Sequence, residues 1–256
     1  MLKISIVTVS YNAVAVIERT MLSVLNQTCP DMEYIVIDGG SSDGTVDVIK
    51  KYADRLAYWA SEPDEGIYDA MNKGIGHAVG DYILFLNAGD TFYENNTLAN
   101  IYPEICQHLG AIFLGDILCM YEGMELCVVH AQDKNSAWYS APHQGMFLPT
   151  QILKGESYDC RFKMLADREL FLRISHRYNI PNYLLCMVVS KYDLSGISSN
   201  RKNALKIFQE SYAISKKYEN ASIIVICKEY SKSIFKYLSR FICSDKLYIN
   251  IRFNRG

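Results

Sequence analysis

The order of apolar segments along the chain constrains the fold most. Short runs rich in valine and isoleucine, typical of buried parallel strands, alternate with segments whose apolar residues recur with helical spacing. The predicted strands lie at residues 4–9, 34–37, 57–60 and 82–86, and the predicted helices at about 17–25, 46–56 and 68–78. Strands that alternate with helices favour a parallel sheet covered by helices. The sequence therefore predicts an α/β fold.

The pattern changes in the second half of the chain. We predict a helix near residues 97–109, strands at 111–118 and 125–130, a helix at 167–178 and a strand at 183–190. The two middle strands flank a turn at residues 121–123 and would add an antiparallel edge to the sheet. Beyond residue 203 only helical periodicity is visible. We therefore predict one α/β domain over residues 1–200, the main domain, and a basic amphipathic helical extension over residues 201–256.

Cysteine usage and hydropathy indicate the setting of the protein. The eight cysteines form no Cys-x-x-Cys pair, so neither a zinc site nor a compact disulfide framework is indicated. No apolar run approaches the roughly 20 residues of a membrane-spanning helix, and the first residues enter a strand without a secretory leader. We expect a cytoplasmic protein.

Charge is distributed unevenly. The overall net charge is −2, but residues 1–200 carry −10 and residues 201–256 carry +8. An acidic body argues against a nucleic-acid partner. Within the extension, basic residues recur every fourth position beside an apolar stripe, at Lys228, Lys232, Lys236 and Arg240. This pattern is typical of a helix lying on an anionic membrane surface, and equally of a helix docked on the main domain with its lysines in water.

Polar residues cluster where predicted strands end, at residues 10–12, 38–45, 64–73 and 87–90. Ligands of open α/β sheets bind outside the carboxyl ends of the strands, so these four loops should share one edge. Neither a dinucleotide fingerprint nor a Walker A loop follows the first strand. The sequence instead indicates a nucleotide site built on carboxylates, in which Asp38 accepts a base or ribose hydrogen bond and Asp90 holds a divalent ion across a pyrophosphate.

Four segments carry a specific resemblance. They are residues 4–12 (ISIVTVSYN), 37–45 (IDGGSSDGT), 64–74 (DEGIYDAMNKG) and 166–173 (ADRELFLR). In this order they resemble family 2 glycosyltransferases of the GT-A fold, in particular the branch that builds O-antigens and other bacterial surface polysaccharides. The resemblance covers about residues 1–200.

The resemblance implies a set of donor-binding residues. It implies that Asp38 contacts the nucleobase and that Asn12 and Asp69 lie around the nucleotide. Lys73 is a further candidate, for the diphosphate. Its alternative role is structural, at a helix C-terminus where lysine suits the helix dipole and Gly74 would serve as a left-handed cap.

The resemblance also implies Mn²⁺ or Mg²⁺ bound by an Asp-x-Asp motif. Here Asn87 and Gly89 stand where acidic residues are common, which leaves Asp90 as the carboxylate of the motif and Asn87 as a donor-binding candidate. Mg²⁺ held by one carboxylate together with substrate phosphates and waters is ordinary.

Two residues are candidates for the chemistry of transfer. The resemblance makes Asp167 the catalytic base of an inverting transfer, and its place at a predicted helix start favours the ionised carboxylate. The alternative for Asp167 is a helix N-cap. His143 is expected near the acceptor or the metal, and its alternative is a packed loop histidine.

These residues lead to one predicted activity. We predict transfer of a sugar from a nucleoside diphosphate donor to a glycan or lipid-linked acceptor. UDP is the first candidate for the nucleotide of this donor. Two alternatives remain. A sugar nucleotidyltransferase should show a glycine-rich basic loop after the first strand, which residues 10–16 lack. A non-catalytic partner of a glycan-assembly complex is the other.

Overall fold

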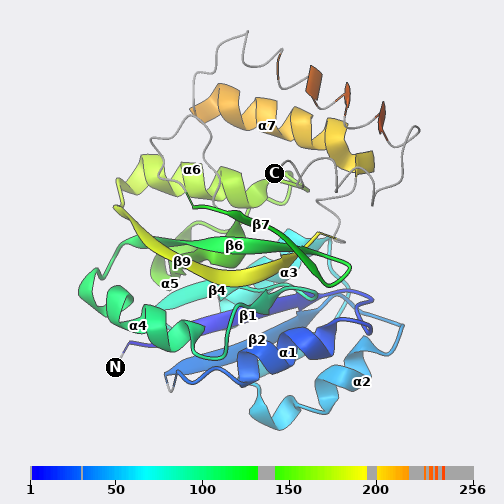
Figure 1. Cartoon of the computed structure of the whole chain (residues 1–256), viewed down its shortest axis with the longest axis vertical. Coiled ribbons are helices and arrows are strands. Elements are labelled where there is room, and N and C mark those ends of the chain that lie inside the picture. Colours follow the sequence, from blue (N-terminus) through cyan, green and yellow to red (C-terminus); the bar gives the residue numbers. More distant parts are fainter. Residues whose placement is uncertain are drawn as a thin grey trace. The chain divides into compact units, whose positions relative to one another are not determined.

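The computed structural model describes most of the chain (Figure 1). The described residues are 2–29, 31–131, 142–194 and 201–218, with short pieces at 228, 231–232, 234–235 and 238–239. Contacts group the chain into one unit of residues 1–118 and 128–192 and a second of residues 119–127 and 193–256. The predicted domain boundary at residue 200 falls in 195–200, outside the described residues.

The described strands form one sheet in the order β3-β2-β1-β4-β8-β6-β9-β5, with β7 paired to β6. The strands are β1 (Ile4–Ser10), β2 (Met32–Asp38), β3 (Tyr58–Ser61), β4 (Tyr82–Phe85), β5 (Thr91–Phe92), β6 (Ile112–Tyr121), β7 (Met124–Val129), β8 (Met146–Pro149) and β9 (Asn182–Asp193). Pairs β1–β2, β1–β4 and β2–β3 are parallel, whereas β8 is antiparallel to both β4 and β6. The predicted α/β fold is confirmed.

Helices cover both faces of the parallel strands. They are α1 (Ile17–Leu25), α2 (Thr45–Lys50), α3 (Ile67–His77), α4 (Thr97–Gln107), α5 (Thr150–Gly155), α6 (Ala166–Tyr178) and, in the second unit, α7 (Ala204–Tyr218). Ile4 and Ile6 of β1 share a buried cluster with residues of α1, α2 and α4. Val7 points to the opposite face, because successive strand residues alternate, and there it meets α3.

Gly74 explains how closely α3 lies on the sheet. A Cβ at this position would stand 2.5 Å from Cγ1 of Val7, so only glycine allows the helix its present distance from β1. The helix continues through Lys73 and Gly74 to His77. The alternative reading of residues 72–74 as a helix end with a left-handed cap was therefore wrong.

Among the short elements that were not predicted, two lie next to the site. β8 and α5 follow each other directly at residues 146–155, and β8 inserts between β4 and β6. The turn before β7 matches the expected one, with left-handed φ at Glu122 and Gly123. Helix α7 agrees with the periodicity beyond residue 203. Of the four basic residues in the predicted stripe, Lys236 and Arg240 lie outside the described residues.

Candidate active site

The parallel strands bring the predicted loops to one edge, where side chains tie them together. Asn12 has a left-handed φ of 47°, and its backbone nitrogen donates to Oγ of Ser41 at 2.7 Å. Its side-chain Oδ1 accepts from the backbone nitrogen of Ser42 at 3.0 Å. Asp43 accepts from the backbone nitrogen of Val14. Asn12 is exposed on this preformed pair of loops. Its contact with a nucleotide stays a prediction.

Asp38 ends β2 and is fully buried. Its oxygens accept five hydrogen bonds, from the hydroxyls of Ser10, Ser41 and Ser61 and from the backbone nitrogens of Gly40 and Ser41. Burial by itself raises the pKa of Asp38, but the hydrogen bonds from Ser41 and Ser61 outweigh it and hold this pKa below its ordinary value. The ionised carboxylate thus shapes the loop at residues 39–42. Direct contact with a nucleobase stays a prediction.

Lys73 and Asp69 lie on α3 and face the loop before it. The Nζ atom of Lys73 is 2.9 Å from Oε1 of Glu62 and donates to the backbone oxygen of Pro63 at 3.0 Å. The hydrogen bond to Glu62 raises the pKa of Lys73. Asp69 accepts from the backbone nitrogen of Glu65 and lies 3.6 Å from Nζ of Lys73. Both side chains therefore hold the loop against α3, and their donor-binding roles stay predictions.

The turn at residues 87–90 follows β4 and is anchored to α1. Gly89 adopts a φ of 107°, its nitrogen donates to Oγ1 of Thr20, and its oxygen accepts from Arg19. The backbone nitrogen of Asp90 closes the turn onto the oxygen of Asn87 at 2.9 Å. The motif residues are therefore held in a fixed turn at the carboxyl end of a buried strand.

One histidine joins this turn to the predicted base. Nε2 of His143 lies 2.8 Å from Nδ2 of Asn87, and Nδ1 of the same ring lies 3.1 Å from Oδ2 of Asp167. The side chains of His143 and Asp167 are 13% and 17% exposed, so a substrate can still reach the carboxylate. Asp167 and Asn87 thus meet at the ring of His143, although they lie 24 and 56 positions from it in the sequence. The structure brings the predicted His143, Asp167 and Asn87 together.

The predicted metal-binding residue is held by the neighbour of His143. Nε2 of the Gln144 amide donates to Oδ2 of Asp90 at 3.0 Å, and both residues are buried. In the same turn, Oδ1 of Asn87 is buried and has no hydrogen-bond partner among the described residues.

A carboxylate and an unsatisfied amide oxygen are hard ligands that suit Mg²⁺ or Mn²⁺. No group of three or more His, Cys, Asp or Glu residues suited to a metal occurs in the described part of the chain. A metal ion would therefore depend on substrate oxygens as well.

Two buried tyrosines surround Asp167 on the other side. The hydroxyl of Tyr68 donates to Oδ1 of Asp167 at 3.3 Å, and the backbone nitrogen of Arg168 donates to the same oxygen at 2.8 Å. Burial and the charge of Asp167 hold the pKa of Tyr68 well above its ordinary value, so this hydroxyl remains a donor. The ring of Tyr158 lies 5.3 Å from that of Tyr68, and its hydroxyl is buried without a hydrogen-bond partner among the described residues.

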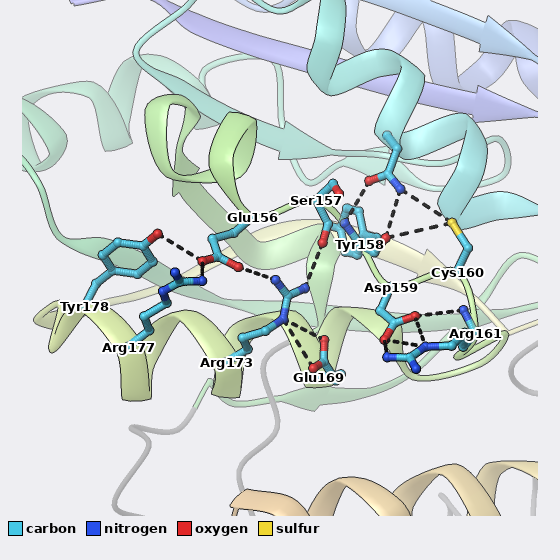
Figure 2. A network of polar contacts seen from close by, with 11 residues as sticks. Glu156, Ser157, Tyr158, Asp159, Cys160, Arg161, Glu169, Arg173, Arg177 and Tyr178 are labelled. Carbon is cyan, nitrogen blue, oxygen red and sulfur yellow. Dashed lines mark hydrogen bonds and ion pairs between the residues drawn. The ribbon is translucent and has the colours of Figure 1, made fainter.

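A polar network behind the site fixes the segment that carries Tyr158 (Figure 2). Arg173 of α6 pairs with the buried carboxylates of Glu156 and Glu169 and donates to the backbone oxygen of Ser157. Glu156 also accepts from Arg177 at 2.5 Å and from Tyr178 at 3.0 Å. From α3, Asn72 exchanges two hydrogen bonds with the backbone of Tyr158. The network joins residues 156–161 to the helix that begins beside Asp167.

Several residues of the site were not found from the sequence. Gln144 follows His143 directly, and that adjacency was the one signal for it. Tyr68 and Tyr158 look like ordinary core aromatics in the sequence. Tyr11 is 65% exposed beside Asn12, and only the structure shows that this large aromatic side chain lies uncovered at the ligand edge of the sheet.

Solved structures show which class of protein this fold defines. S. aureus TarS, residues 1-349, in complex with UDP-GlcNAc superposes with a TM-score of 0.67 over 93% of this chain and 73% of that one, at 16% identity. The mannosyltransferase PcManGT from Pyrobaculum calidifontis, in complex with GDP-Man and Mn²⁺, gives 0.65 over 95% and 76% at 14% identity. The fold is that of the GT-A glycosyltransferases, as predicted.

Sequence comparison identifies the family. The model of glycosyl transferase family 2 matches residues 5–169. The chain therefore belongs to glycosyl transferase family 2. A PGL/p-HBAD biosynthesis glycosyltransferase of Mycobacterium bovis (strain BCG / Pasteur 1173P2) is 28% identical over 236 residues, which are 90% of this chain and 91% of that protein.

Within the described residues, no helix is both long and apolar enough to cross a membrane.

Proposed function

We propose that this glycosyltransferase transfers a sugar, with inversion, from a UDP donor to a hydroxyl of a glycan or lipid-linked acceptor in surface polysaccharide biosynthesis. One observation carries the proposal. Asp167 is a partly exposed carboxylate that His143 joins to Asn87 of the motif turn. A proton acceptor therefore stands beside the turn at which the resemblance puts the donor diphosphate. Family membership and the UDP-GlcNAc of TarS support a nucleotide-sugar donor.

The reaction would be a single displacement. The acceptor oxygen forms a bond to the anomeric carbon while the bond from that carbon to the diphosphate oxygen breaks, and Asp167 takes the hydroxyl proton. Attack from the face opposite the leaving group inverts the anomeric centre. Where Asp90 and Asn87 hold a divalent ion, the ion would supply positive charge to the departing diphosphate.

The donor nucleotide would lie on the loops after β1 and β2. Asn12 and Asp69 would contact the nucleotide, and Lys73 would reach the diphosphate. Asp38 would hold the loop at residues 39–42 in place beneath the nucleotide. The exposed ring of Tyr11 offers a flat face on which a nucleobase can stack.

A panel of nucleotide sugars tests the proposed function. A ligand at 100 times its Kd stabilises the folded protein by about 2.7 kcal/mol, so the true donor should raise Tm clearly. The same donor should then be hydrolysed slowly or transferred to acceptor glycans. A non-catalytic partner would bind a donor without turning it over, and a nucleotidyltransferase would require a nucleoside triphosphate. Either result would overturn the proposal.

A metal prediction follows from the composition of the motif turn. We expect UDP to bind more tightly with Mn²⁺ or Mg²⁺ than with EDTA, and we expect Asp90→Ala to remove most of this difference because it deletes the one carboxylate of the motif. Calorimetric titration measures both. Asp81→Ala, at the exposed opposite end of β4, is the matched control and should leave the metal effect intact. Equal UDP affinity with and without metal in the unmutated protein would contradict the prediction.

Membrane association is proposed for the basic extension, which would hold the enzyme on the cytoplasmic face beside a lipid-linked acceptor. Each lysine or arginine near an anionic surface contributes about 1 kcal/mol, so four on one flank should suffice for reversible binding. We expect co-sedimentation with anionic but not neutral vesicles, weakened by salt and lost when residues 222–256 are deleted. Full-length folded protein that stays in the supernatant at low salt would show that the extension packs on the enzyme.

A further inference from the structure

The short 3₁₀ turn at His143–Gly145 contacts both halves of the proposed reaction centre. His143 reaches Asp167 with one ring nitrogen and Asn87 with the other. Its neighbour Gln144 donates to Asp90. Two consecutive residues of one turn therefore contact the base and both polar side chains of the motif turn.

The backbone holds this turn firmly. The nitrogen of Gly145 donates to the oxygen of Pro142 at 2.9 Å, and a Cβ on Gly145 would clash with the backbone oxygen of Gly115. Immediately after the turn, β8 is hydrogen-bonded between β4 and β6. The turn is thus fixed by the sheet, which suits a positioning element.

Hydrogen-bond chemistry fixes where the ring proton of His143 lies. Asn87 presents its amide nitrogen, which can only donate, so Nε2 of His143 is the acceptor. In the neutral ring the proton is then on Nδ1, where it faces Oδ2 of Asp167. The Nε2–H form would set two donors against each other at Asn87 and two acceptors against each other at Asp167.

Counting acceptor sites on Asp167 shows which atom remains for a substrate. Oδ1 already accepts from the hydroxyl of Tyr68 and the backbone nitrogen of Arg168, whereas Oδ2, among the described residues, accepts from His143 alone. A carboxylate offers about two acceptor positions on each oxygen. Oδ2 therefore keeps one position for the proton of an acceptor hydroxyl.

We propose that His143 is the positioning residue of the transfer reaction. Its Nδ1–H orients Asp167 so that Oδ2 receives the acceptor proton, and its Nε2 holds the Asn87 amide so that the buried Oδ1 stays available to the bound donor or its metal. The proposal rests on the proposed function, since it assigns a role within that reaction. It replaces the sequence-based expectation of direct contact with acceptor or metal.

Two near-isosteric substitutions separate the two contacts of the ring. In His143→Asn the amide nitrogen takes the place of Nδ1 and still donates to Asp167, whereas in His143→Gln the amide takes the place of Nε2 and reaches only Asn87. Misplacing a reacting group by about 1 Å can lower a rate about 10²-fold. We expect His143→Ala and His143→Gln to lower kcat by about this factor, and His143→Asn to recover most of the loss because it keeps the donor to Asp167.

The control is His77→Asn, on the exposed end of α3, which should leave kcat unchanged. Normal kcat in His143→Ala, or rescue by Gln in place of Asn, would overturn the proposal.

A second measurement does not depend on activity. Nitrogen-15 NMR of the histidine rings should show the neutral ring of His143 in the Nδ1–H form, against the Nε2–H form that free histidine prefers. Asp167→Ala should shift the ring towards the ordinary form. An Nε2–H ring in the unmutated protein would overturn the inference even if the enzyme is fully active. Failure of every nucleotide sugar to react would instead count against the proposed function, with the NMR result unaffected.

Discussion

Replacing Asp167 by asparagine is expected to lower the transfer rate by about 10²–10⁴-fold, the usual contribution of a general base. The amide keeps the shape of the side chain and an oxygen for Tyr68 and Arg168, but it cannot take the acceptor proton. Donor affinity should stay nearly intact, because the donor is proposed to lie on other loops. Initial rates with saturating donor measure the loss of transfer, and calorimetric titration with UDP measures donor affinity. The stereochemistry of the wild-type product shows whether the anomeric centre is inverted.

The control for this variant is Asp47→Asn, which changes an exposed carboxylate of α2 that pairs with Lys50. It should transfer as well as the unmutated enzyme. If Asp167→Asn remains folded and retains near-normal transfer, Asp167 serves only the start of α6. The role of His143 as the residue that orients the base would fall with it.

The parallel half of the fold could be predicted from the sequence largely because three of its strands are buried on both faces. β1, β2 and β4 are near-continuous apolar runs, so their existence and order follow from local pattern. β8 and α5 could not be predicted in this way. β8 is four residues long and ends at Pro149, and what makes it a strand is pairing with β4 and β6, which are distant in sequence.

The same distinction between local pattern and distant contacts applies to the candidate site. Asp38 and Asp90 were proposed because they follow predicted strands of the sheet, and Asp167 because it falls in a segment that resembles a known family. The contacts between side chains from different segments were not. Asn87 and Asp167 meet at His143 only because β4, the turn before β8 and α6 converge at one edge of the sheet. The spacing of residues along the chain does not predict that convergence.

Lys73 shows how a local rule can mislead. Lysine followed by glycine is typical of a helix C-terminus, and the sequence offered that reading. Gly74 instead lies within α3 because the helix approaches β1 at Val7, where no side chain fits. Tertiary packing, not capping, explains the glycine.

Replacing Arg173 by methionine is expected to destabilise the fold by about 3–5 kcal/mol, the cost of removing one partner from a buried ion pair. Glu156 and Glu169 are 4% and 1% exposed, and Arg173 pairs with both (Figure 2). For a chain of this size, about 2–4 °C of Tm per kcal/mol gives a fall of roughly 6–20 °C. Thermal and denaturant unfolding measure it. Arg161→Met is the matched control, since that side chain is 85% exposed and surface pairs contribute at most about 1 kcal/mol.

The difference in the free energy of unfolding between wild type and Arg173→Met should depend on pH. This dependence separates the effect of lost charge pairing from that of lost packing. Burial alone raises the pKa of Glu156, but its hydrogen bonds with Tyr178 and Arg173 and the charges of Arg173 and Arg177 bring the folded-state pKa below the unfolded one. The stabilisation is therefore present above the unfolded pKa and is lost as pH falls through the folded one. The difference in the free energy of unfolding between wild type and Arg173→Met should become smaller below about pH 4.5, the ordinary pKa of glutamate. A gap that persists unchanged in acid would mean that Arg173 stabilises α6 through its aliphatic stem rather than through Glu156.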